Sequence, residues 1–136
     1  MPGLVDPYEH TPVYLQLADL IREDIAVGRL APGRMLPSES RLSQQHGVGR
    51  DAVREALAEL RSEGLIVTEN GVGSKVREPV EREIVRLRSG DQAWPRMPTP
   101  AERRRLRILE GTPVIVVERD GEQTVYVGDR TLLVPE

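Results

Sequence analysis

The sequence predicts an α+β fold in which three helices and a β-hairpin precede a small β-rich module. Two features carry this prediction. Residues 36–65 show two helical patterns separated by a tight turn at a glycine, and strand patterns lie on either side of Asn70 and Gly71, a dipeptide typical of hairpins. Three helices followed by such a hairpin make a winged helix-turn-helix, in which the hairpin is the wing.

The first helix is predicted over residues 13–27, after a flexible N-terminal arm at 1–11. Thr11 is expected to cap this helix, with Pro12 at its first position. Its apolar stripe steps by three and four residues through Tyr14, Leu17, Ile21 and Ile25. Gly28 ends the helix, and a turn at 30–33 leads into a very short strand at 35–36.

The second and third helices follow closely on each other. Ser38 is a good N-cap for the second helix, and Glu39 suits its positive end. Gly47 is expected in the left-handed conformation after the second helix, and Val48 is expected to fill the turn with apolar surface. The third helix is predicted over 50–63. Its buried face is formed by Val53, Ala56, Leu57 and Leu60, and Gly64 stops it.

The wing and the second module complete the prediction. Strands at 65–68 and 74–77 flank a turn at 69–73. Pro79 marks a boundary, which separates a winged domain at 12–78 from a module at 79–136. The module is expected to contain strands at 84–87, 93–97, 114–117, 124–127 and 132–134, and a short helix from Pro100 to about residue 108, capped by Thr99. A module this small is marginal alone, so we expect it to pack on the first domain or on another copy.

Composition excludes several classes of function. The chain has 136 residues and no cysteine, which rules out disulfides and thiolate metal sites. His10 and His46 lie too far apart to form a ligand pair with metal-site spacing. There is no nucleophile–base pair, glycine-rich phosphate loop or carboxylate cluster, so we expect neither an enzyme nor a bound cofactor. No apolar run approaches the ~20 residues of a membrane span, and a signal peptide is lacking, so the expected location is the cytoplasm.

The third helix carries the candidate DNA-reading residues. Net charge is −3, so DNA binding would depend on local cations. A helix can enter the major groove and reach base edges with its N-terminal residues. Arg50, Asp51 and Arg54 occupy the first turn and a half, and the two arginines share one face because they are four residues apart.

Each candidate also has a purely structural interpretation. Arg50 and Arg54 could form a solvated face, with Arg54 paired to Asp51 or Glu55. Arg41, in the first turn of the second helix, could bind phosphate or be an ordinary exposed charge. The remaining candidates lie in the wing, where phosphate or minor-groove contact competes with ordinary turn and strand roles. These wing residues are Asn70, Gly71, Gly73, Lys75 and Arg77.

Ordered motifs in the first half resemble the DNA-binding domain of GntR-family bacterial transcription regulators. They are PVYLQL at 12–17, GRLAPG at 28–33, LPSE at 36–39, VGR at 48–50, VREAL at 53–57 and EGLI at 63–66. The resemblance implies a cytoplasmic homodimeric repressor that binds an inverted-repeat DNA operator. It also implies that Arg50 and Arg54 touch DNA and that Gly71 reaches the minor groove. The full set of predicted DNA-binding residues is Ser38, Arg41, Arg50, Asp51, Ala52, Arg54, Asn70, Gly71 and Lys75.

Three positions depart from the family pattern. The family often has Ser or Thr where Gly49 lies, so the cap of the third helix is weaker here. It often has Thr in place of Ala52. Many members carry Arg where this chain has Ser40, and Arg41 next to it would point ~100° away. These changes affect the base preference more than DNA binding itself.

The second module resembles, more loosely, the opening of the ligand-sensing domain in the HutC-type branch of the family. The motifs are MPTPAE at 97–102, EGTPV at 110–114 and ERDG at 118–121. The chain ends less than half way through such a domain, so a shortened C-terminal domain is expected. It would serve dimerisation or respond to an unidentified small-molecule effector. The strand at 114–117 would face either a partner subunit or the monomer core. The basic cluster at 103–107 would bind phosphate or form a solvated face, and Trp94 and Tyr126 would line a ligand site or pack in a core.

The main alternative function is a winged helix that binds another protein instead of DNA. The two functions differ in their response to salt, because neutralising phosphates releases counterions and gives DNA binding a steep dependence on salt concentration. The sequence alone does not choose between a ligand-responsive and a constitutive repressor.

Overall fold

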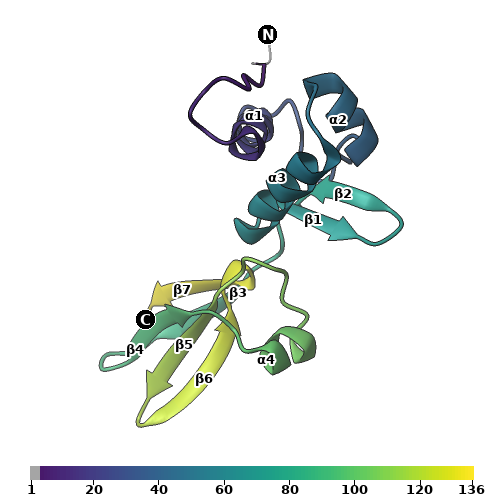
Figure 1. Cartoon of the computed structure of the whole chain (residues 1–136). Helices are drawn as coiled ribbons and strands as arrows, with labels where there is room; N and C mark the ends of the chain where they lie inside the picture. The colour runs from purple at the N-terminus through teal and green to yellow at the C-terminus, as the bar shows by residue number, and fades with distance from the viewer. Residues whose placement is uncertain (1–3) are drawn as a thin grey trace. The chain divides into compact units, whose positions relative to one another are not determined.

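The computed structural model describes residues 4–136, and these residues divide into two compact units. The first extends to Glu78 and the second runs from Pro79 to Glu136. The first unit contains three helices and one hairpin, and the second contains two small sheets and one short helix (Figure 1). The mixed α+β class and the winged helix-turn-helix are therefore confirmed. No helix within the described range has the length and apolar character that a membrane crossing demands.

The first unit is built on the packing of α1 (Val13–Ala26) against α3 (Arg50–Ser62). The apolar stripe of α1 places Leu17 and Ile21 in the core, and Tyr14 and Ile25 at its margin. The four predicted core residues of α3 are all buried. Arg22 on α1 also binds Glu63 just after α3, with Nη2 2.8 Å from Oε2. The hydrogen bond to Glu63 raises the pKa of the Arg22 guanidinium.

The start of α1 differs from the prediction. Pro12 is itself the N-cap residue, and no side chain caps the helix, so the predicted cap at Thr11 is wrong. The Thr11 carbonyl instead accepts a hydrogen bond from Gln16, 2.8 Å away. Gln16 is 8% exposed, and it also exchanges two hydrogen bonds with the backbone of Asp6. Residues 1–3 of the predicted arm lie outside the described part of the chain.

The helix-turn-helix proper consists of α2 (Glu39–His46) and α3. The Ser38 hydroxyl accepts from the Arg41 backbone N–H at 3.1 Å and so caps α2. Gly47 has a φ of 64°, the left-handed conformation that glycine adopts with little strain. Val48 packs against the core, and its N–H donates to the Ser43 carbonyl. These contacts fix the turn that brings α2 across α3.

The wing is an antiparallel hairpin of β1 (Ile66–Glu69) and β2 (Gly73–Val76). Glu69 pairs with Gly73, so the loop comprises residues 70–72, with Gly71 at a φ of 78°. The short strand predicted at 35–36 is a single bridge from Met35 to Lys75. Arg61 of α3 donates to the Thr68 hydroxyl at 3.0 Å, which ties the wing to the third helix.

The second unit contains a parallel pair, β3 (Glu83–Leu87) with β7 (Thr131–Pro135), and an antiparallel sheet. The sheet order is β4 (Gln92–Arg96), β5 (Val114–Arg119) and β6 (Glu122–Val127). A short 3-10 turn at Gly128–Arg130 precedes β7. Asp120 and Gly121 both have positive φ in a two-residue hairpin loop, as a type I′ turn requires. β5 is the central strand, and three of its valines are buried by this chain alone.

The helix α4 (Pro100–Arg105) is shorter than predicted. Its start is as predicted, because Thr99 and Glu102 form a reciprocal capping box. Its end differs from the prediction, because Arg107 adopts a φ of 52° and a right-handed helix does not continue through a residue with positive φ. Ile108 is then 6% exposed, and its N–H bonds to the Arg103 carbonyl. Burial of Ile108 therefore accompanies the early end of the helix.

Two ion pairs order the second unit. Arg119 on β5 binds Asp91, the residue before β4, and the Asp91 side chain is only 3% exposed. This hydrogen bond, assisted by the Arg88 backbone N–H, lowers the pKa of Asp91 to about 2. Arg96 binds Glu102 through two hydrogen bonds at 2.7 and 2.9 Å. That contact, together with the Thr99 backbone N–H, lowers the pKa of Glu102 to about 2.

Candidate nucleic-acid interface

The candidate interface starts from the exposed N-terminal end of α3. Arg50 is the first residue of this helix, and its N-cap is Gly49, which has no side chain to cap the helix. Arg50, Asp51 and Arg54 are exposed, while Ala52 is half-buried. The free N–H groups and aligned dipoles of a helix N-terminus favour an anion such as phosphate. Two exposed guanidinium groups beside that end strengthen the local positive field.

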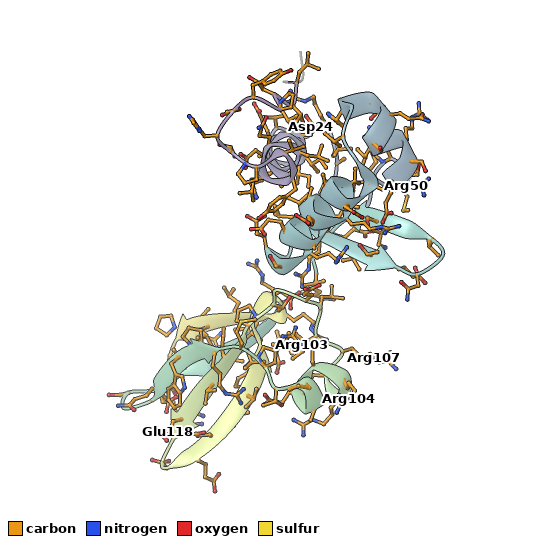
Figure 2. All side chains as sticks on the ribbon, in the orientation of Figure 1. Asp24, Arg50, Arg103, Arg104, Arg107 and Glu118 are labelled. Atoms are coloured by element: carbon orange, nitrogen blue, oxygen red, sulfur yellow. The ribbon has the colours of Figure 1, made fainter. Side chains whose placement is uncertain are left out.

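Arg50 and Arg54 are both held by the first turn of α2. The Nε of Arg54 lies 3.1 Å from Oε2 of Glu39. Arg50 donates from Nη2 to the Ser40 hydroxyl. Figure 2 shows Arg50 where α2 and α3 approach each other. The structural interpretation in which Arg54 pairs with Asp51 or Glu55 is therefore not the observed one, because its observed acid partner is on the other helix.

The start of α2 supplies two further predicted residues. Ser38 is exposed, but its hydroxyl accepts the Arg41 backbone N–H as the helix cap. Arg41 is exposed in the first turn, one position beyond Ser40. Ser38 therefore combines a structural role with a surface position, and Arg41 is a third exposed candidate arginine beside Arg50 and Arg54.

The wing brings Asn70 and Gly71 near the start of α2. A groove of about 490 Å3 lies between these elements, and its lining includes Ser38, Glu39, Asn70 and Gly71. A Cβ at position 71 would meet nothing within 4 Å, so glycine is favoured there by the positive φ and not by lack of space. Lys75 lies on β2 with half of its side chain exposed, 3.9 Å from a carboxylate oxygen of Glu78.

The structure thus gathers five of the nine predicted residues into two groups, which leaves out Arg41, Asp51, Ala52 and Lys75. Arg50 and Arg54 bind Ser40 and Glu39 in the first turn of α2, and Ser38, Asn70 and Gly71 line the groove beside the wing. Glu39 belongs to both groups, because it lines the groove and binds Arg54. Sequence reasoning missed Glu39 and Ser40 as partners of the arginines. Cross-helix pairs of this kind depend on how α2 crosses α3, which local patterns do not specify.

The second unit offers weaker candidates. Arg103 donates to the Leu109 carbonyl, whereas Arg104, Arg105 and Arg107 are exposed. Figure 2 shows Arg103, Arg104 and Arg107 leaving the α4 segment in different directions, which does not favour one flat basic patch. The lining of an open hollow of about 550 Å3 between β3 and the β5–β6 hairpin includes charged residues, Tyr126 and the apolar Ile84 and Val117. No group of three potential metal ligands exists among the described residues.

Known proteins match the first unit most closely. Residues 13–76 match the family described as bacterial regulatory proteins, gntR family. The solved structure of YtrA from Sulfolobus acidocaldarius, a GntR-family transcription factor, is 38% identical with a TM-score of 0.54. That comparison covers 59% of this chain and 84% of YtrA. A repressor of a mannosyl-D-glycerate transport/metabolism system, MngR of Escherichia coli (strain K12), is 44% identical over 84 residues.

The curated relatives are considerably longer than the matched region. The MngR match covers 61% of this chain and 35% of MngR. The transcriptional repressor NagR of Bacillus subtilis (strain 168) is 38% identical over 68 residues, which cover 50% of this chain and 28% of NagR. The matched part of the chain thus spans about a third of each of these relatives. All three relatives are named as transcription regulators and none as an enzyme, in line with the predicted class.

The fold and these relatives together define the class of the first unit, a winged helix-turn-helix of the kind found in transcription regulators. The chain belongs to the GntR family of bacterial regulatory proteins.

Proposed function

We infer that this chain is a repressor that binds an inverted-repeat DNA operator as a homodimer, with α3 in the major groove. The observation that carries the proposal is the pair of exposed arginines, Arg50 and Arg54, at the N-terminal end of α3. Arginine can form a two-pronged hydrogen-bonded pair with guanine, and residues at this end of a recognition helix reach base edges. The repressors MngR and NagR, similar in this region, support the sign of regulation.

The other predicted residues take supporting roles in this proposal. Arg41 and Lys75 bind phosphate from either side of α3, while Asp51 and Ala52 face the groove beside the arginines. Gly71, at the wing tip, approaches the minor groove, and Asn70 shapes or joins that contact. Ser38 caps α2 and contacts the DNA backbone. Phosphate contacts of this kind fix register, and base contacts supply the sequence preference.

The second unit serves dimerisation in this proposal, as a HutC-type module. Burial of Val114, Val116 and Val117 within the chain argues against β5 as the contact surface. The parallel pair β3–β7 is the better candidate, because Ile84 and Leu132 are register partners and are 59% and 43% exposed. Parallel strands are normally covered on both faces.

The proposal is tested by selecting bound sequences from random DNA and then measuring mobility shifts at several salt concentrations. The expected result is one enriched motif with two-fold symmetry and a steep loss of affinity with salt. A winged helix that binds protein instead would enrich no motif and would show no steep salt dependence.

A further inference from the structure

Adjacent residues at the start of α2 hold the two candidate base-reading arginines of α3. Glu39 binds Arg54 at 3.1 Å, and Ser40 accepts a hydrogen bond from Arg50. Each contact crosses between helices, fifteen positions apart for Arg54 and ten for Arg50. The next residue, Arg41, donates its backbone N–H to the cap at Ser38.

These contacts are too exposed to be needed for folding. The side chains of Arg54 and Glu39 are 60% and 43% exposed, and ion pairs at such sites contribute little to stability. The core beneath them already joins the two helices through Leu42, Val53 and Leu57. What the contacts do fix is the direction of two long, flexible side chains that point toward solvent.

Each arginine donates one of its five N–H groups to a residue of α2, which leaves four for another partner. A guanidinium whose orientation is set before binding can match the two acceptors of one base without searching other rotamers. The two contacts differ in charge, however. Glu39 offsets the charge of Arg54 and so weakens its attraction to any phosphate, whereas Ser40 is neutral and leaves the charge of Arg50 unchanged.

We propose that Glu39 and Ser40 are specificity-determining positioning residues, which aim Arg54 and Arg50 from α2. The base pairs that α3 reads are then set by α2 as well as by α3. Glu39 has a second effect, since it restrains sequence-independent binding by Arg54. This inference rests on the proposed function and deepens it.

The test compares Glu39→Gln, Ser40→Ala and Ser40→Thr with the wild-type chain. Affinity is measured for the DNA sequence selected by the wild-type chain and for duplexes changed at single base pairs, at several salt concentrations. Ser40→Ala should reduce the discrimination between these duplexes about tenfold with an unchanged salt slope, while Ser40→Thr, which keeps the hydroxyl, should restore it. Glu39→Gln keeps only a neutral amide oxygen, which is a weaker partner for Arg54, so it should reduce discrimination by less than Ser40→Ala does. It should also steepen the salt slope by up to about 0.9, because Arg54 then neutralises a phosphate.

Glu23→Gln on α1 is the charge-matched control, since it removes an exposed carboxylate outside α2 and α3. It should change neither discrimination nor slope. Thermal melting should be the same for all variants, which separates positioning from folding. Unchanged discrimination in both Glu39→Gln and Ser40→Ala would overturn the inference while leaving DNA binding intact. A wild-type chain with no preferred sequence would overturn the proposed function as well.

Discussion

At the scale of single residues, the sequence predicts local roles such as caps and buried positions better than it predicts which side chains contact each other across helices. The cap at Ser38, the left-handed Gly47 and the buried face of α3 all follow from local rules, because each depends on neighbours a few positions away. The partners of Arg50 and Arg54 do not, since Ser40 and Glu39 reach them only after α2 has packed across α3. Helical spacing offers Asp51 and Glu55 as alternative partners for Arg54, whereas the observed acid partner, Glu39, lies on α2.

A substitution at Lys75 distinguishes a phosphate contact, which does not depend on DNA sequence, from recognition of a base. If this side chain binds phosphate, Lys75→Ala should weaken binding to all DNA sequences by a similar factor. The slope of log affinity against log salt should also become shallower by about 0.9. Mobility shifts on preferred and altered duplexes would measure both effects. A change confined to one base pair would show instead that Lys75 reads sequence.

At the scale of elements, the helices and the hairpins were predicted well, and long-range pairing was not. A hairpin such as β5–β6 is specified by its own turn at Asp120 and Gly121. The parallel pairing of β3 with β7 joins segments at opposite ends of the module, and no local signal specifies it. The helix α4 ends before the positive φ of Arg107, next to the buried Ile108, and neither feature has a local signal in the sequence.

Gly49→Ser should improve the start of α3. Gly49 is the N-cap with a φ of −70°, and a Cβ there meets nothing within 4 Å, so serine fits without strain. The new hydroxyl can accept an orphan N–H of the first turn, which should stabilise the fold by a few tenths of a kcal/mol. Urea unfolding would measure the gain. A loss of stability would mean that the turn requires glycine itself.

The ion pair of Asp91 with Arg119 predicts a dependence of stability on pH. Its folded-state pKa of about 2 lies below the ordinary value of 3.8, so the carboxylate contributes stability above pH 4 to 5. That contribution should disappear as the pH falls toward 2. Asp91→Asn should therefore be less stable than wild type near pH 7, and the difference should shrink below about pH 5.

The sole tryptophan, Trp94 on β4, provides a fluorescence probe for unfolding of the second unit. Trp94 fluorescence should be followed during urea unfolding at several pH values for the wild-type protein and for Asp91→Asn. A stability difference between wild type and Asp91→Asn that stays constant from pH 7 to pH 2 would contradict the assigned role of Asp91.

At the scale of the whole molecule, the division into a winged unit and a β-rich unit separates two proposed tasks. The first unit has its own core of eleven buried apolar residues, so it should fold alone. A fragment ending at Glu78 is expected to be monomeric and to bind a single half-site weakly, because the proposed dimer contact lies in the second unit. Light scattering would measure its mass. A dimeric fragment would place the dimer contact in the winged unit instead.

The central claim is that α3 reads DNA through Arg50 and Arg54. The most direct test is the affinity of the chain carrying both Arg50→Ala and Arg54→Ala for the sequence that the wild-type chain selects. The account predicts that sequence-specific binding disappears, with unchanged circular dichroism and melting temperature because both side chains are exposed. Wild-type affinity and sequence preference in the doubly substituted chain would contradict it.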